Sequence, residues 1–141
     1  MIYTTTNSLS KAIYEKLDDA YLLGAVSTNL SNAYHNLDKI DSAEYYCLEA
    51  IRLHTKANDE YGLSIAYNGY ASLQSAKGDT TRALEYFEKA LKLKENLNEQ
   101  VGISSILIQM AKIYKYQNKN ANELDCLTKA KTIAENNNFK K

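Results

Sequence analysis

The side chains in this sequence with the most versatile chemistry are its two histidines, because an imidazole can bind a metal or transfer a proton near neutral pH. They are His35 and His54, and neither has a cysteine or carboxylate at the spacing of a metal-ligand motif. His54 shares its position in the 40-residue repeat described below with Lys94 and Ala134, a combination typical of a solvent-facing position. We therefore predict exposed, non-catalytic histidines and no metal site. On this basis His54→Ala is expected to change the free energy of unfolding by no more than about half a kcal/mol.

The two cysteines are a second candidate for chemistry, as nucleophiles or as a disulfide. Cys47 occupies the repeat position of Phe87, which predicts a buried thiol, and Cys126 occupies the position of Tyr86. Both are expected to be packing residues. Because they belong to the first and third units of the repeat, the distance between them should exceed the reach of a disulfide.

Twelve tyrosines raise the alternative of an aromatic platform for bases or sugars. Most recur at equivalent positions of the repeat, such as Tyr34 with Tyr114 and Tyr46 with Tyr86, and this recurrence favours a packing role. Tyr116 is the exception.

No constellation for catalysis is visible. The sequence contains no glycine-rich phosphate loop, no serine or cysteine nucleophile with a partnered base, and no convergent pair of acids. We therefore predict no catalytic residue, no cofactor and no enzymatic activity.

The charges of the chain balance, because Lys plus Arg and Asp plus Glu each number 17. A neutral chain has no excess charge to attract phosphate backbones, so nucleic acid is not an expected partner. No apolar run approaches the roughly 20 residues of a membrane-spanning helix, and the polar start gives no sign of a signal peptide. That start could be a boundary within a longer chain, so the compartment stays open, with the cytoplasm as the default expectation.

The elements that position these residues follow from a period of 40 residues. Each unit has small residues at fixed positions of two helical stretches, with large apolar residues beside them, which is the pattern of two closely packed helices. The small positions are Ser31, Ala71 and Ala111 in the first stretch and Ala50, Ala90 and Ala130 in the second.

This pattern predicts an all-α chain, a right-handed solenoid of about three helical hairpins preceded by an N-terminal helix. Asp41 with Glu44, and Asn120 with Glu123, have the spacing of a capping box at the start of a second helix. The expected helices are 8–21, 24–37, 41–57, 62–77, 80–97, 102–117 and 121–135.

The domain organisation follows from the same register. Residues 1–21 are expected to form a capping helix or the remnant of an earlier repeat. Residues 22–141 then comprise three repeats, about 22–61, 62–101 and 102–135, with a short polar C-terminal tail.

The middle unit resembles the tetratricopeptide repeat. It has Tyr67 and Ala71 at the aromatic and small positions of that family's first helix. After a Gly-Asp turn it has Ala83, Phe87 and Ala90 at the family's positions in the second helix. The resemblance implies stacked helical hairpins that bind a protein or a peptide.

The resemblance covers roughly residues 22–135, with departures. Gln74 stands where the family prefers Tyr, and the family's proline after the second helix is absent. The long form of the repeat, in which Asp59-Glu60-Tyr61-Gly62 and Glu99-Gln100-Val101-Gly102 open the next unit, is similar to repeat regions of bacterial histidine kinases and helix-turn-helix transcription factors. It implies the sensing or docking region of a larger bacterial signalling protein.

In a stack of this kind the first helices line a concave groove, and the positions left after the packing residues are removed should face it. This lining is polar and nearly neutral, which suits the backbone of an extended peptide. A basic clamp for acidic C-terminal tails, present in some family members, is matched only at Asn32, so no preference for such tails is expected. The predicted groove residues are Thr28, Asn29, Asn32, Asn36, Ile65, Asn68, Ser72, Ser105, Ile108, Gln109, Lys112 and Tyr116.

We therefore predict an interaction scaffold whose partner is a protein or an extended peptide. The alternative is a structural spacer or self-association element with no ligand in the groove. Because Leu124, Leu127 and Ile133 form an apolar stripe on the last predicted helix, the chain is also expected to form a homo-oligomer through its C-terminal end.

Overall fold

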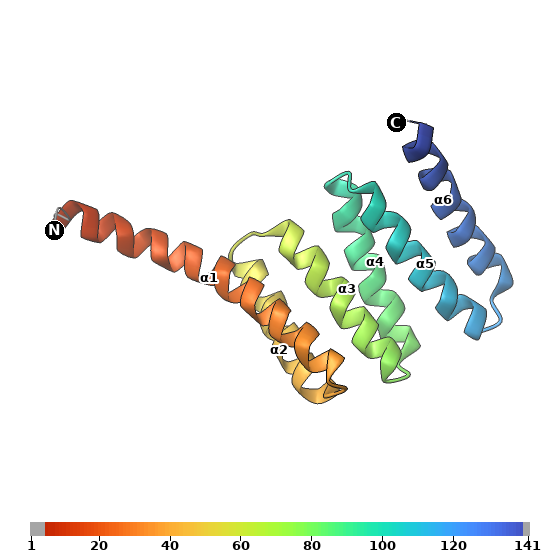
Figure 1. Ribbon diagram of the computed structural model, residues 1–141, viewed down its shortest axis with the longest axis horizontal. Helices are drawn as coiled ribbons and strands as arrows, with labels where there is room; N and C mark the ends of the chain where they lie inside the picture. The colour runs from red at the N-terminus through yellow and green to blue at the C-terminus, as the bar shows by residue number, and fades with distance from the viewer. Residues whose placement is uncertain (1–4, 140–141) are drawn as a thin grey trace. The chain divides into compact units, whose positions relative to one another are not determined.

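The structure is a computed structural model that describes residues 5–139 of the chain, and the side chains of residues 19–137. Figure 1 shows helices joined by short turns, and residues 5–139 contain no strand. The all-α expectation is confirmed. The helices are α1 (Thr5–Asn36), α2 (Ile40–Lys56), α3 (Glu60–Ala76), α4 (Thr80–Asn96), α5 (Gln100–Tyr116) and α6 (Asn120–Phe139).

Each turn between consecutive helices ends the preceding helix in the same way. The second residue of the turn has a positive φ, which is the left-handed conformation that commonly terminates a helix. These residues are Asp38 (φ 60°), Asn58 (φ 53°), Gly78 (φ 88°), Asn98 (φ 53°) and Asn118 (φ 59°). The turns within hairpins and between hairpins are therefore alike.

The backbone of each turn forms the paired hydrogen bonds of a Schellman motif. In the turn after α2, the N–H of Asn58 donates to the carbonyl of Thr55 (3.1 Å) and the N–H of Asp59 donates to the carbonyl of His54 (2.9 Å). Glu99 and Lys94 make the equivalent bond after α4, at 3.0 Å. A residue near the end of one helix is thereby held beside the residue that precedes the next.

The first helix differs from the prediction. Two helices were expected, 8–21 and 24–37, but α1 runs from Thr5 to Asn36 without a break. The signal for a break was Gly24, and a glycine costs a helix only about 1 kcal/mol. Gly24 is buried in the helix, and a Cβ there would lie 2.9 Å from the His54 ring. This glycine serves a close side-chain approach and does not end the helix.

The predicted capping box at Asp41 is also wrong. The helix begins at Ile40, one residue before Asp41, and the residue before the helix is Lys39, whose side chain makes no capping hydrogen bond. Because the turn residue Asp38 already fixes where α2 starts, Asp41 falls inside the first turn of the helix. A side-chain cap is present before α4, where Asp79 accepts a hydrogen bond from the N–H of Arg82.

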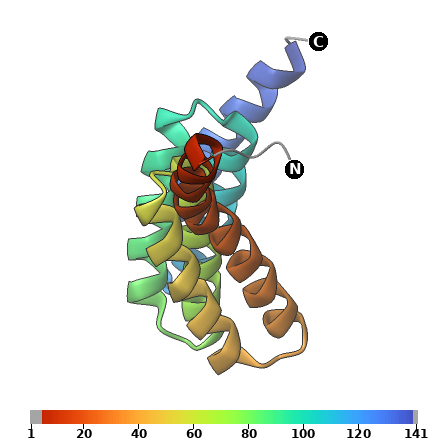
Figure 2. The same ribbon diagram turned by 90° about the vertical axis from the view of Figure 1, so that its left-hand side faces the viewer.

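Contacts within the chain group into two compact units, residues 1–66 and 67–141. In the first unit α1 and α2 lie side by side, as Figures 1 and 2 both show. Small residues face each other there, with Ser31 and Ala43 5% and 0% exposed. The Ser31 hydroxyl donates to the Ala43 carbonyl at 2.7 Å, so the two helices approach closely at this crossing.

The second unit has its own apolar core. Phe87 of α4 is 1% exposed and packs among buried residues of α3, α5 and α6. The small positions of the repeat lie at the centre of the packing, as predicted: Ala71 and Ala90 are fully buried and Ala111 nearly so. None of the helices described for residues 5–139 combines the length and the apolar character needed to cross a bilayer.

Candidate functional site

The predicted groove residues of the first unit fall into two groups. Asn29, Asn32 and Asn36 are exposed on α1. Thr28 is half-buried, and its hydroxyl contacts His54 at 3.3 Å and the carbonyl of Gly24 at 3.0 Å. Thr28 therefore serves the packing between helices, whereas the asparagines present free amide surface on the helix.

Four of the predicted groove residues of the second unit come together in one pocket. Ser72 of α3 and Gln109, Lys112 and Tyr116 of α5 line a pocket of about 570 Å³. This volume is within the range of pockets that bind small ligands or single side chains. Phe87 and Ile113 also line the pocket, and both are buried, so it has an apolar floor.

The remaining predicted residues lie outside this pocket. Ile65 and Asn68 are half-buried on α3, while Ser105 and Ile108 are exposed on α5. Tyr116, the tyrosine that has no equivalent in the other repeats, is 82% exposed and stands at the rim of the pocket.

The amide of Gln109 organises the polar side of the pocket. Its Oε1 accepts a hydrogen bond from the Ser72 hydroxyl at 3.1 Å. Its Nε2 donates to Asn68 Oδ1 at 3.4 Å and to the carbonyl of Ser105 at 3.5 Å. Both bonds of the Nε2 group are long, so this donor is weakly held and available to a ligand carbonyl.

The charge of the pocket differs from the prediction of a nearly neutral lining. Lys77, in the turn before α4, joins Lys112 in the lining, and no carboxylate is among the described residues that line the pocket. The sequence analysis missed Lys77 because it considered only residues on the first helices. A Gly-containing turn between helices is the signal by which Lys77 could have been included.

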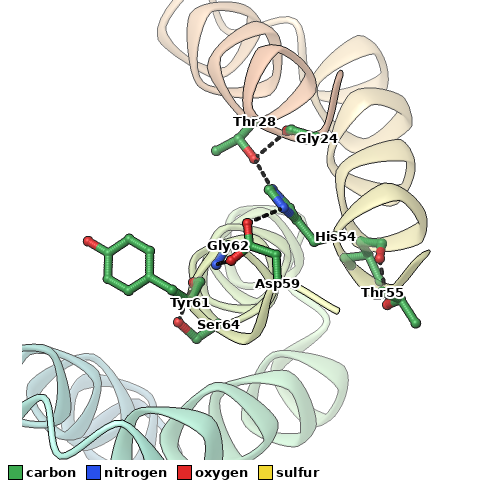
Figure 3. Close-up of polar contacts among 9 residues, drawn as sticks. Gly24, Thr28, His54, Thr55, Asp59, Tyr61, Gly62 and Ser64 are labelled. Carbon is green, nitrogen blue, oxygen red and sulfur yellow. Dashed lines mark hydrogen bonds and ion pairs between the residues drawn. The ribbon is translucent and has the colours of Figure 1, made fainter. Parts of the chain in front are cut away.

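His54 is buried, and the prediction that it is exposed is wrong. Its relative exposure is 3%, and its ring lies between α1 and the start of α3 (Figure 3). Nδ1 is 3.1 Å from Asp59 Oδ2, and the Asp59 Oδ1 atom accepts a hydrogen bond from the N–H of Gly62 at 3.0 Å. We call these residues, Gly24, Thr28, His54, Asp59 and Gly62, the His54 junction.

Glycine is required on both sides of the ring. A Cβ at Gly62 would collide with the His54 ring and with the Asp59 carboxylate, and a Cβ at Gly24 would also be too close to the ring. The backbone of the Schellman turn brings His54 and Asp59 together, and the two glycines make room for the imidazole.

The second unit repeats this arrangement with lysine. Lys94 is 6% exposed, and its Nζ lies 2.7 Å from Glu99 Oε2. A Cβ at Gly102 would lie 3.0 Å from Lys94 Cδ, so the lysine stem packs against that glycine. The shared pattern is a cation, an acid five residues later and a glycine three residues after the acid. This spacing was visible in the sequence as a signal for a buried ion pair.

The cysteines are packing residues, as predicted. Cys47 and Cys126 are buried, free thiols. The Cys47 Sγ donates to the carbonyl of Ala66 at 3.3 Å. Burial raises the pKa of Cys47 to about 12, which keeps the thiol protonated and unreactive at neutral pH.

The tyrosines that recur in the repeat also pack. Tyr34 and Tyr46 stack with ring centroids 5.5 Å apart, and Tyr86 makes edge contacts with Tyr67 and Tyr70. Among residues whose side chains are described, no group of three His, Cys, Asp or Glu residues could hold a metal ion.

Known proteins match this chain over its repeats. The family model described as "Tetratricopeptide repeat" matches residues 22–96. A curated relative, the 43 kDa receptor-associated protein of the synapse from Tetronarce californica, is 22% identical over 107 residues, which are 76% of this chain and 26% of that protein.

A solved structure, that of BtubC (BKLC) from P. vanneervenii, has a TM-score of 0.76 and 26% sequence identity. The match covers 82% of this chain and 48% of that one, so the chain spans about a quarter of the curated relative and about half of the solved structure. The family model covers more than half of the 141 residues, and the chain therefore belongs to the tetratricopeptide repeat family.

Proposed function

We propose that this chain is a scaffold that binds an extended peptide or a protein segment, with the pocket between α3 and α5 as its principal contact. Tetratricopeptide repeats generally mediate protein–protein interaction, and this is the coarse function of the chain. The observation that carries the finer proposal is the convergence of Ser72, Gln109, Lys112 and Tyr116 around one pocket with an apolar floor.

The chemistry of the pocket fits a segment of polypeptide. The apolar floor can receive a side chain, and burial of apolar area contributes roughly 25 cal/mol per Å². The weakly held amide of Gln109 and the Ser72 hydroxyl can pair with the ligand backbone. Tyr116 offers a rigid amphipathic ring of the kind enriched at contact surfaces.

We further propose that the chain belongs to the sensing or docking region of a larger bacterial signalling protein, such as a histidine kinase or a transcription regulator. The support is the 40-residue period and the acid and glycine that open the second and third units at Asp59, Gly62, Glu99 and Gly102. The sequence on either side of this chain in its gene tests this proposal: a kinase or DNA-binding domain supports it, and an enzyme of unrelated metabolism contradicts it.

An NMR titration of the full chain with a pool of unstructured peptides tests the binding proposal. We expect saturable shifts of the Asn68 and Lys112 amides, with weaker shifts at Asn32. Lys112→Ala and Tyr116→Ala should reduce the affinity several-fold. Lys115→Ala, on the same helix and outside the pocket, is the matched control and should leave the affinity unchanged. An absence of saturable shifts would favour the alternative role of a spacer or self-association element.

A further inference from the structure

His54 is a buried titratable group that the proposed peptide site does not use, and its contacts determine how many protons its ring carries. On one side, Nε2 is 3.3 Å from the Thr28 hydroxyl oxygen. That hydroxyl donates its hydrogen to the carbonyl of Gly24 at 3.0 Å. Because a hydroxyl has a single hydrogen, Thr28 presents a lone pair to the ring, and Nε2 must carry a hydrogen to donate.

On the other side, Nδ1 faces the Asp59 Oδ2 atom at 3.1 Å. The second carboxylate oxygen of Asp59 accepts from the N–H of Gly62 at 3.0 Å, which favours the ionised, acceptor-only form of the acid. An unprotonated Nδ1 would oppose a lone pair to a carboxylate. Both ring nitrogens therefore carry hydrogens, and the ring in this arrangement is the imidazolium cation.

The equivalent position in the second unit supports the need for a cation. Lys94 occupies it, and its ammonium group is 2.7 Å from Glu99. The two positions differ in one chemical respect, because an imidazolium gives up its second proton close to neutral pH and an ammonium does not.

We propose that the His54 junction is a proton-dependent latch between α1, α2 and the first turn of α3. When the imidazolium loses a proton, the neutral ring retains one donor for two acceptors, so one of the contacts with Thr28 and Asp59 must break. Because the closed junction holds a proton that the opened side chain can release, rising pH favours the open form.

The other charged side chains of these elements do not contact the ring. On α1, Asp19 is exposed, on α2, Lys56 is exposed, and on α3, Glu60 is exposed. Glu49 of α2 is engaged with Arg52 at 2.8 Å. Asp59 is thus the charged partner of His54 among the residues whose side chains are described.

Amide hydrogen exchange in the full chain, followed from about pH 5 to about pH 8, tests the latch across the range of histidine titration. The reporter is the amide of Gly62, which donates to Asp59. After correction for intrinsic exchange, its protection should fall about tenfold over this range, the size expected for losing a hydrogen bond to a charged group. The ring ¹⁵N signals of His54 should show both nitrogens protonated at the acidic end.

Three variants separate the latch from general effects of pH. His54→Lys should keep Gly62 protected throughout, as a cation that holds its charge. His35→Gln, which leaves His54 as the remaining histidine, should retain the full pH dependence. Lys94→His should transfer the dependence to the amides at the start of α5.

Constant Gly62 protection in the unmodified chain would overturn the proposal. The same pH dependence in His54→Lys would also overturn it. If His54→Lys fails to fold, as judged by helical circular dichroism, Asp59→Asn replaces it, and a pH dependence that persists without the carboxylate contradicts the latch.

Discussion

At the scale of single residues, positions 54 and 94 hold cations that the fold buries within a turn between hairpins. Sequence patterns ordinarily assign His or Lys at such positions to the solvent, because charged groups are rarely buried without a partner. Here the partner is five residues further along the chain, at Asp59 and Glu99. Burial of these side chains therefore depends on the geometry of a turn and not on their hydropathy.

The first prediction concerns the removal of that partner. His54→Ala should lower the free energy of unfolding by about 1–3 kcal/mol, because Asp59 then keeps a carboxylate that is largely buried and has lost its charged partner. This replaces the smaller effect expected from sequence. Urea unfolding at a fixed acidic pH measures it, with His35→Ala as the control. An effect no larger than that of the control would contradict the assigned role of His54.

The second prediction concerns the packing of small residues between helices. Ala90 is fully buried in the core of the second unit, so Ala90→Leu should overpack the helix crossing and cost about 1–3 kcal/mol. Ala121→Leu, at an exposed position of α6, is the matched control and should change the stability by less than about 0.5 kcal/mol. Thermal or urea unfolding compares the two, and equal effects would show that Ala90 does not lie at a tight crossing.

The third prediction concerns thiol reactivity. Because burial raises the pKa of Cys47 to about 12, the native thiol should react with iodoacetamide far more slowly than a free cysteine at pH 8. Mass spectrometry of the labelled protein measures the rate, and unfolding in urea should restore it. Rapid labelling of the folded chain would mean that Cys47 is accessible.

At the scale of elements, the sequence predicted the helices well and their first residues less well. The helices of the second unit follow the apolar and small positions of the repeat, and Ala71, Ala90 and Ala111 are buried as expected. The starts of α3 and α5 were predicted two residues late, at 62 and 102, because Gly62 and Gly102 resemble turn residues. In the structure these glycines lie inside helices, where they receive the side chains of His54 and Lys94.

The candidate site was predictable in part for the same reason. Helical spacing placed Ser72, Gln109, Lys112 and Tyr116 on neighbouring faces, and these residues line one pocket. Thr28 has the same kind of spacing but contacts His54, which depends on Gly24 and on a turn three-dimensional in origin. Contacts between turns and distant helices carry no periodicity, so sequence analysis could not find them by its repeat columns.

At the scale of the whole molecule, the balanced charge leaves association to apolar and hydrogen-bonding surfaces. The exposed face of α6 is one such surface, because Leu124 is 67% exposed and Leu127 is 42% exposed. Ile133 on the same helix is half-buried. Apolar area of this kind tends to be covered by another surface.

The fourth prediction is that the chain self-associates through α6. Sedimentation over a range of concentrations should show reversible assembly that Leu124→Lys weakens at least several-fold. Leu48→Lys, at an exposed leucine of α2, is the matched control and should leave the assembly intact. A monomer at all concentrations, or an assembly that is indifferent to Leu124→Lys, contradicts this prediction.

The identical turns of the chain have a consequence for how its length can change. Helices start at residues 40, 60, 80, 100 and 120, so the chain advances in steps of 20 residues and alternates between two helix types. A tandem duplication of residues 60–99 in the gene would therefore join Glu99 to a second Glu60, in the same local sequence context as Asp59 before Glu60. Such an insertion adds one hairpin and preserves the alternation. A 20-residue insertion would instead place two helices of the same type in succession and leave one of them without its complementary face. Lengthening by recombination is thus tolerated in units of 40 residues, which allows the ligand-binding surface to grow without redesign of any existing contact.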